Sequence, residues 1–265
     1  MTDIVKSSSR MWSERMDQGR RVAGMKYRMM MASLLAIIAS PVCAAKLSGP
    51  PRIVDGNTIE IEQTKIRLSG IDAPETDQIC LDAHGQKWAC GVAARDALIK
   101  HSNGRTWDCH TTGVDEYGRS FGRCFIAGED VNAWMVSSGW ALSSVRDTHT
   151  YVVYEVVASN AYAGLWSGAF ITPWDWRHRN KGTIIIGASS VPIDAQELLL
   201  GSALLSDPPS PDCLIKGTVG RKGERIYHLP EQLGYGQIDM TKKLDDRWLC
   251  SEAEAEATGW RKSAR

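Results

Sequence analysis

RIVDGNTIEI (Arg52–Ile61) and KIRLSGIDAPE (Lys65–Glu75) are the two stretches that decide the fold of this 265-residue chain. The first alternates apolar and polar residues around a Gly-Asn turn, and the second alternates as far as Ile71, as half-buried strands do. Pro74 ends the second strand, because proline cannot donate to the hydrogen-bond ladder of a central strand. Together the two stretches predict the start of a small β-sheet.

The same stretches bring three carboxylates, those of Asp55, Asp72 and Glu75, close to the guanidinium of Arg67. Carboxylate oxygens are the ligands that a hard cation such as Ca²⁺ prefers. A guanidinium suits an anionic substrate such as a phosphodiester. Asn57 stands where this chemistry favours another acid, because an amide offers an oxygen but no negative charge. The sequence therefore predicts a polar site for a metal ion and an anionic substrate.

Helical and hairpin patterns follow these strands. Apolar residues recur at helical spacing, and two apolar runs flank the turn DEYG (115–118). The predicted elements are a helix over 88–101, a hairpin over 105–111 and 120–126, a short helix over 131–138 and a longer one over 151–165. Strands, a hairpin and about three helices in so short a chain favour an α+β fold, a five-stranded barrel with helices packed on it.

Residues 1–45 look like a targeting segment. Basic residues precede an apolar run, residues 29–45, that ends in the small pair Ala44-Ala45, which suits cleavage by signal peptidase. An uncleaved membrane anchor is the alternative, but a run of about 17 residues interrupted by Pro41 is short for a span. We therefore expect export to the periplasm or the medium of a bacterium, with no stable membrane insertion after cleavage.

The charge of the chain is balanced overall and uneven along its length. The formal net charge is zero, but residues 1–45 carry seven Lys/Arg and three Asp/Glu, which leaves a net charge of −4 on the rest. A general polyanion-binding protein would show a basic surface field, so this balance argues against that class. Phosphate recognition must then depend on a few local arginines.

Residues 180–211 are rich in Gly, Ser and Pro, and we interpret them as a linker. The linker would separate a main domain, residues 46–179, from a small C-terminal module, residues 212–265. A unit of about 50 residues needs a cross-link or a metal to be stable. The composition therefore predicts two folded parts of unequal size.

Six cysteines remain after removal of the targeting segment, and an even number in an exported chain indicates disulfides. Cys109 and Cys124 flank the predicted hairpin turn at equal distances, so they form a natural pair. Assigning the two cysteines of the C-terminal module to each other leaves Cys80 to pair with Cys90.

The C-terminal module contains Cys213 and Cys250, and a disulfide between them would contribute roughly 4 kcal/mol in the chain-entropy model. The alternative is a zinc site that adds His228 to the two cysteines. Tetrahedral zinc sites need four ligands, and a fourth is not evident. The disulfide is the favoured interpretation.

Five motifs in this order resemble the staphylococcal nuclease (thermonuclease) family: VDGNTIEI, IRLSGIDAPE, DEYGRSFG, EDVNAWMVSSGWA and AYAGLWSG. They span residues 51–176, and their order and spacing make the resemblance specific. The resemblance implies an OB-fold barrel with three helices. It also implies Ca²⁺-dependent cleavage of DNA and RNA phosphodiesters, with nucleic acid as the substrate; it does not indicate an oligomeric state.

The resemblance implies a set of metal ligands. Asp72 matches a calcium-binding carboxylate, and the backbone carbonyl of Ala73 matches a second ligand. Asn57 falls where the family has another calcium-binding acid. Because affinity for Ca²⁺ depends on ligand charge, we expect weaker binding of the ion, with Asp55 as a further candidate ligand.

The resemblance also implies the catalytic groups. Glu75 matches the acid assigned as general base, and Arg67 and Arg119 match the two phosphate-binding arginines. Tyr117 matches a tyrosine beside the nucleotide phosphate. Two guanidiniums can stabilise the negative charge that develops on the phosphate oxygens, and a carboxylate can take a proton from water.

Two departures from the family pattern suggest a second function. The loop that carries base-stacking tyrosines in the family reads SSVRD (Ser143–Asp147), and Glu116 replaces a basic residue before Tyr117. With Asn57, these changes favour the alternative of a non-catalytic envelope protein that binds a polymer or a protein partner.

Overall fold

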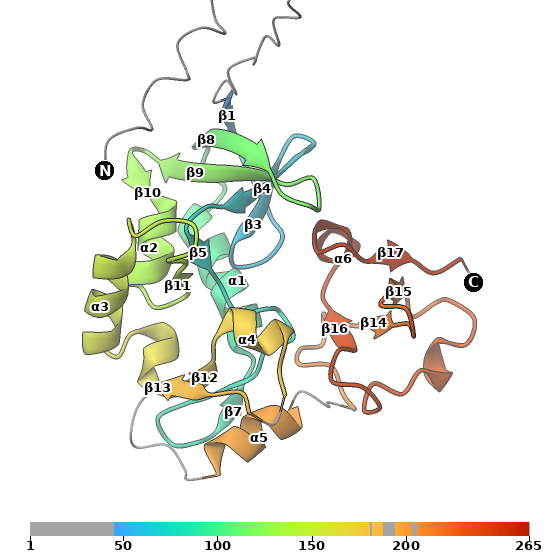
Figure 1. Cartoon of the computed structure of the whole chain (residues 1–265). Helices are drawn as coiled ribbons and strands as arrows, with labels where there is room; N and C mark the ends of the chain where they lie inside the picture. The colour runs from blue at the N-terminus through green and yellow to red at the C-terminus, as the bar shows by residue number, and fades with distance from the viewer. Residues whose placement is uncertain (1–44, 181, 188–193, 203–205, 265) are drawn as a thin grey trace, which may run out of the picture. The chain divides into compact units, whose positions relative to one another are not determined.

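The computed structural model describes residues 45–180, 182–187, 194–202 and 206–264 (Figure 1). The predicted targeting segment, residues 1–45, lies outside the described residues except for Ala45. Among the described residues, no helix combines the length and apolar composition needed to cross a bilayer.

The main sheet is a curled sheet of seven strands. Its strands follow the path β1 (Ala45–Gly49), β8 (Trp107–Val114), β9 (Ser120–Ile126), β4 (Thr64–Leu68), β3 (Thr58–Ile61) and β2 (Arg52–Ile53), with β10 (Glu129–Asp130) beside β9. Neighbours are antiparallel except β4 and β9, which are parallel, with Ile66 opposite Ser120. The predicted α+β class is confirmed. Two strands more than expected arise because β1 extends the hairpin edge and β10 returns along β9.

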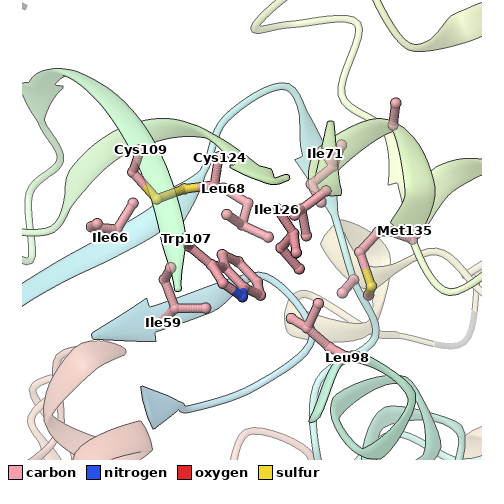
Figure 2. Packing of buried hydrophobic residues seen from close by; sticks show 14 of the residues in the cluster. Ile59, Ile66, Leu68, Ile71, Leu98, Trp107, Cys109, Cys124, Ile126 and Met135 are labelled. Carbon is pink, nitrogen blue, oxygen red and sulfur yellow. A yellow bond between two sulfur atoms is a disulfide. The ribbon is translucent and has the colours of Figure 1, made fainter. Parts of the chain in front are cut away.

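The core of the main sheet forms around Trp107, which is completely buried. Figure 2 shows its indole among aliphatic side chains from the strands and from α1, close to the Cys109–Cys124 disulfide. The indole N–H donates to Ser102 Oγ at 3.1 Å, so the one polar atom of the ring is satisfied. Strand β4 contributes Ile66 and Leu68 to this core, as its alternating pattern predicts.

Helices pack against the main sheet and against the smaller sheets. The described residues form α1 (Cys90–Ser102), α2 (Val131–Ser137), α3 (Val152–Asn160), a 3-10 turn (Gly164–Ser167), α4 (Pro173–Arg177), α5 (Ala195–Ser202) and α6 (Glu252–Ala257). Asp130 caps α2 by accepting from the Ala133 N–H at 3.1 Å. Helix α3 is shorter than the 151–165 pattern predicts, because Tyr162 adopts a left-handed φ of 53° and ends the helical path.

Two smaller sheets complete the main domain: β5 (Ile71–Asp72) with β11 (Leu142–Ser143), and β13 (Ile185–Gly187), β12 (Ala169–Ile171), β6 (Cys80–Leu81) and β7 (Lys87–Trp88) in that order. The second sheet and α5 bury a separate cluster that includes Leu81, Trp176 and Leu199. The segment predicted as a linker therefore contains β13 and α5, both packed on the main domain.

The C-terminal module has its own sheet, β16 (Arg247–Leu249), β14 (Ile215–Val219), β15 (Arg225–His228) and β17 (Arg261–Lys262), with a 3-10 turn at Tyr235–Gln237. Tyr227, Leu249 and Trp260 lie in its core. Cys213 is bonded to Cys250, and Cys80 to Cys90, so all three expected pairs are present. His228 Nε2 lies 3.1 Å from Thr218 Oγ1.

Candidate functional site

A cleft with a volume of about 740 Å³ contains all the site residues predicted from the sequence. They come from the loop between β2 and β3, from β4, from the end of β5 and the loop after it, and from the hairpin turn between β8 and β9: Asp55, Asn57, Arg67, Asp72, Ala73, Glu75, Tyr117 and Arg119. The C-terminal module also lines the cleft, through Arg225, Arg247 and Trp260. The structure thus brings together residues that are up to about two hundred positions apart.

Local geometry explains how the carboxylates reach the cleft. On β4, alternation buries Ile66 and Leu68 and directs Arg67 to the opposite face. A Cβ on Gly56 would lie 2.7 Å from Ala73 Cβ, so glycine is needed for the close approach of the two loops. A Cβ on Gly91, in the first turn of α1, would lie 1.6 Å from the Glu75 carbonyl oxygen. Both glycines fix the backbone of the candidate site.

Asp72 accepts hydrogen bonds from several side chains of the site, and its own side chain is 5% exposed. Arg67 Nη2 donates to Oδ1 at 3.0 Å. Arg177 donates to Oδ1 from Nη1 at 3.2 Å and to Oδ2 from Nη2 at 2.5 Å. Asn57 Nδ2 donates to Oδ1 at 3.1 Å. Both carboxylate oxygens of Asp72 are therefore bound by guanidinium groups.

Glu75, the predicted general base, is also held by two arginines. Arg177 Nη1 donates to Oε1 at 2.6 Å, and Arg247 Nη2 donates to Oε2 at 2.9 Å. Burial alone would raise the pKa of Glu75, but the guanidiniums of Arg247 and Arg177 outweigh it and hold the pKa well below its usual range. Glu75 is therefore ionised at neutral pH and a weak base.

Arg119 lies beside this cluster on the hairpin turn. Its Nε donates to Asp115 Oδ2 at 2.7 Å, and its Nη1 donates to Thr58 Oγ1 at 3.3 Å. Its guanidinium lies 5.3 Å from the centre of the Tyr117 ring. Among the described residues, Nη2 of Arg119 has no hydrogen-bond partner, so this atom is available to an anionic ligand in the cleft.

The donor set does not fit Ca²⁺ as it stands. Two guanidiniums hold the oxygens of Asp72, and the Asn57 amide presents its N–H to Asp72. Asp55 Oδ1 accepts from the backbone N–H of Asn57 at 2.8 Å, and burial raises the pKa of Asp55. Within the part of the chain that the structure describes, no group of three or more His, Cys, Asp or Glu could hold a metal ion.

Comparison with known proteins gives the family. Residues 65–168 match the family model described as staphylococcal nuclease homologue. The chain is 34% identical over 171 residues to the succinoglycan biosynthesis protein ExoI of Rhizobium meliloti (strain 1021), covering 61% of this chain and 87% of that protein. It is 30% identical over 173 residues to a micrococcal nuclease of Shigella flexneri, covering 58% of this chain and 93% of that protein. The chain belongs to the staphylococcal nuclease family. A staphylococcal-like nuclease of Arabidopsis thaliana, CAN1, is 30% identical over 121 residues, 44% of this chain and 34% of that protein.

Two arginines of this nuclease-family site were missed by sequence reasoning. Arg177 ends the PWDWR motif, where Thr172 caps α4 and a proline begins it. A threonine cap and a proline are local signals of a helix start, and they carry no information on the partners of its last side chain. Arg247 lies 172 residues from Glu75, and no local pattern connects the two.

The C-terminal module contacts three consecutive residues of the main domain, Glu75 of the site and the two residues after it. Arg247 bonds Glu75 and also donates from Nε to Asp77 Oδ2 at 3.0 Å. Between these acids, the Thr76 hydroxyl donates to Glu254, whose other oxygen accepts from the Cys250 N–H at 2.8 Å. The module is therefore attached at Glu75, which the sequence assigns to catalysis, and at the two residues that follow it.

Glu254 predicts a measurable pH effect. Burial raises its pKa to about 8, from an ordinary value of 4.5. An acid whose pKa is raised by folding adds stability at low pH, and this stability is lost as the pH rises from about 4.5 through about 8. The free energy of unfolding should fall by at most about 1.4 kcal/mol per pH unit there.

Glu254→Gln should remove this loss, because glutamine can accept from Cys250 N–H and donate to Thr76. Urea unfolding of the wild type and of Glu254→Gln at pH 5 and pH 8 measures the free energy of unfolding. Relative to the variant, the wild type should lose stability between the two pH values. Parallel profiles would contradict the buried protonated acid.

Proposed function

We propose that this protein hydrolyses phosphodiester bonds of DNA or RNA outside the bacterial cytoplasm. The observation that supports the proposal is that Arg67 and Arg119 line the same cleft as Asp72 and Glu75, in a chain of the staphylococcal nuclease family. The two guanidiniums would bind the phosphate and stabilise the charge that develops on its oxygens. Tyr117 would lie beside the bound nucleotide.

Glu75 would take a proton from the attacking water. A carboxylate has about four lone-pair positions, and two guanidinium N–H groups take only two of them. The remaining positions can accept from water, and the lowered pKa keeps the group ionised. The same lowered pKa weakens Glu75 as a base, which favours slow turnover.

Calcium is a separate part of the proposal. The candidate ligands Asp72, Asn57 and the Ala73 carbonyl line the cleft. The ion would compete with Arg177 for Asp72, since that arginine donates to both carboxylate oxygens and its positive charge repels a cation. Cleavage should therefore be measured with Ca²⁺ and with EDTA.

Export is supported by the three disulfides, since such bonds persist in oxidising compartments. The targeting pattern in residues 1–45 supports it independently. Extracellular or periplasmic nucleic acid would then be the substrate.

A non-catalytic polymer-binding protein is the second candidate. It is favoured by the two ion pairs of Glu75 with Arg177 and Arg247, because their positive charges weaken the expected general base. The name of one relative, succinoglycan biosynthesis protein ExoI, does not mention a nuclease, which also supports this candidate.

The test is cleavage of end-labelled single-stranded DNA by the oxidised protein without its targeting segment. We expect cleavage, and we expect Glu75→Gln to slow it by about 10²–10⁴-fold, the range of a lost general base. Intact DNA in both Ca²⁺ and EDTA would reject the nuclease. DNA that is bound but left uncut would establish the second candidate.

A further inference from the structure

Two guanidiniums occupy two carboxylates of the site, Asp72, where the family resemblance implies a cation, and Glu75, where it implies the general base. Arg177 donates to both oxygens of Asp72 and to Oε1 of Glu75. Arg247 donates to the remaining oxygen of Glu75 and to Asp77. Together they bring two positive charges, the charge of a divalent cation, to one group of acids. Their flat forks match carboxylate geometry better than a lysine ammonium would.

Asn57 supports the same arrangement independently. Its Nδ2 donates to Asp72 Oδ1 at 3.1 Å, and both side chains are buried. A carboxylate at this position would face Asp72 with like charge and would need a cation between them. An amide gives Asp72 a further hydrogen bond, so it suits a site in which arginines supply the positive charge.

Both arginines extend from ordered elements. Arg177 closes α4, and the neighbouring Trp176 is buried and donates from Nε1 to Asp77 Oδ1 at 3.0 Å. Arg247 begins β16, where its backbone is paired with Gly217 of β14, three residues before the Cys213–Cys250 disulfide. Neither guanidinium is a mobile surface group, since their side chains are 29% and 10% exposed.

We propose that Arg177 and Arg247 take the place of a divalent cation as the positive charge that holds Asp72 and Glu75 together. The C-terminal module is then a part of the site, because it supplies one of the two charges. The inference rests on the proposed function for the identity of the site, but it concerns ion binding and not turnover. Arg247 is a positioning residue in this scheme, since it acts on substrate only through Glu75.

The test is a calorimetric titration of the protein with CaCl₂, without DNA. The wild type should bind Ca²⁺ weakly. Arg177→Gln frees Oδ2 of Asp72, leaves Oδ1 bonded to Arg67 and Asn57, and removes one positive charge. Its affinity for Ca²⁺ should therefore rise by at least about tenfold. Arg247→Gln should raise the affinity as well, because it frees one oxygen of Glu75. Arg177→Lys keeps the charge and should remain close to the wild type.

Arg52→Gln is the matched control, because it removes an arginine–carboxylate pair, Arg52–Glu60, outside the cleft. Its affinity for Ca²⁺ should equal that of the wild type. Wild-type protein that binds Ca²⁺ as tightly as Arg177→Gln would overturn the proposal, and so would an equal gain in the control. Failure to cut DNA would reject the nuclease and leave this result standing, so the two outcomes are distinguishable.

Discussion

Arg119→Ala should lower kcat/KM for single-stranded DNA by about 10²–10³-fold, the usual effect of removing one donor from a developing oxyanion. The side chain is held in place by Asp115 and Thr58, which leaves Nη2 for the substrate. Because that interaction strengthens as charge develops on the phosphate, the loss should fall mainly on kcat and less on KM.

The effect must be separated from a loss of stability. Arg119 is 5% exposed, and its removal leaves Asp115 without its ion-pair partner. Thermal unfolding should accompany the rate measurements, and Arg119→Lys should restore the charge but not the fork. Arg123→Ala is the control, because this arginine also lies on the β8–β9 hairpin but its side chain is 51% exposed and outside the cleft. Equal rates for Arg119→Ala and Arg123→Ala would exclude Arg119 from catalysis.

The site residues that could be predicted from the sequence are those whose positions depend on a pattern of a few neighbouring residues. Arg67 is directed to the cleft by alternation along β4, and Arg119 follows from the turn DEYGR. Asp115 Oδ1 accepts from the backbone N–H of Arg119 at 2.9 Å, which is the local bond that such turn sequences favour. Periodicity and turn chemistry act over a few residues, so this part of the site could be predicted.

The partners of Glu75 could not be predicted in that way. Arg177 and Arg247 lie 102 and 172 residues from Glu75 in the sequence. A buried ion pair produces no periodic pattern in either of the two segments that form it. The same limit affected residues 180–211. Their Gly, Ser and Pro content indicates a linker, yet Ala195 and Leu199 of α5 are completely buried against the main domain. Composition gives the average polarity of a segment, but it does not show which face of a helix in that segment is buried.

Arg247→Ala should reduce the free energy of unfolding by about 3–5 kcal/mol, the usual cost of removing one partner from a buried ion pair. The change leaves Glu75 and Asp77, whose side chains are 14% and 5% exposed, without this cation. It also removes a charged contact between β16 and the segment before α1. Urea unfolding followed by tryptophan fluorescence measures the loss, because Trp176 and Trp248 are both buried near this contact.

The pH dependence identifies the cause. In the wild type the pKa of Glu75 is lowered, so its stabilising contribution is present above its ordinary pKa of 4.5 and is lost as the pH falls below it. Without Arg247 one opposing charge is gone and burial raises the pKa, so the acid-side loss of stability should begin at higher pH. Arg221→Ala, on an exposed turn of the C-terminal module, should change neither the stability nor its pH profile. If Arg247→Ala behaves like Arg221→Ala, Arg247 does not hold Glu75, and the C-terminal module is not a part of the site.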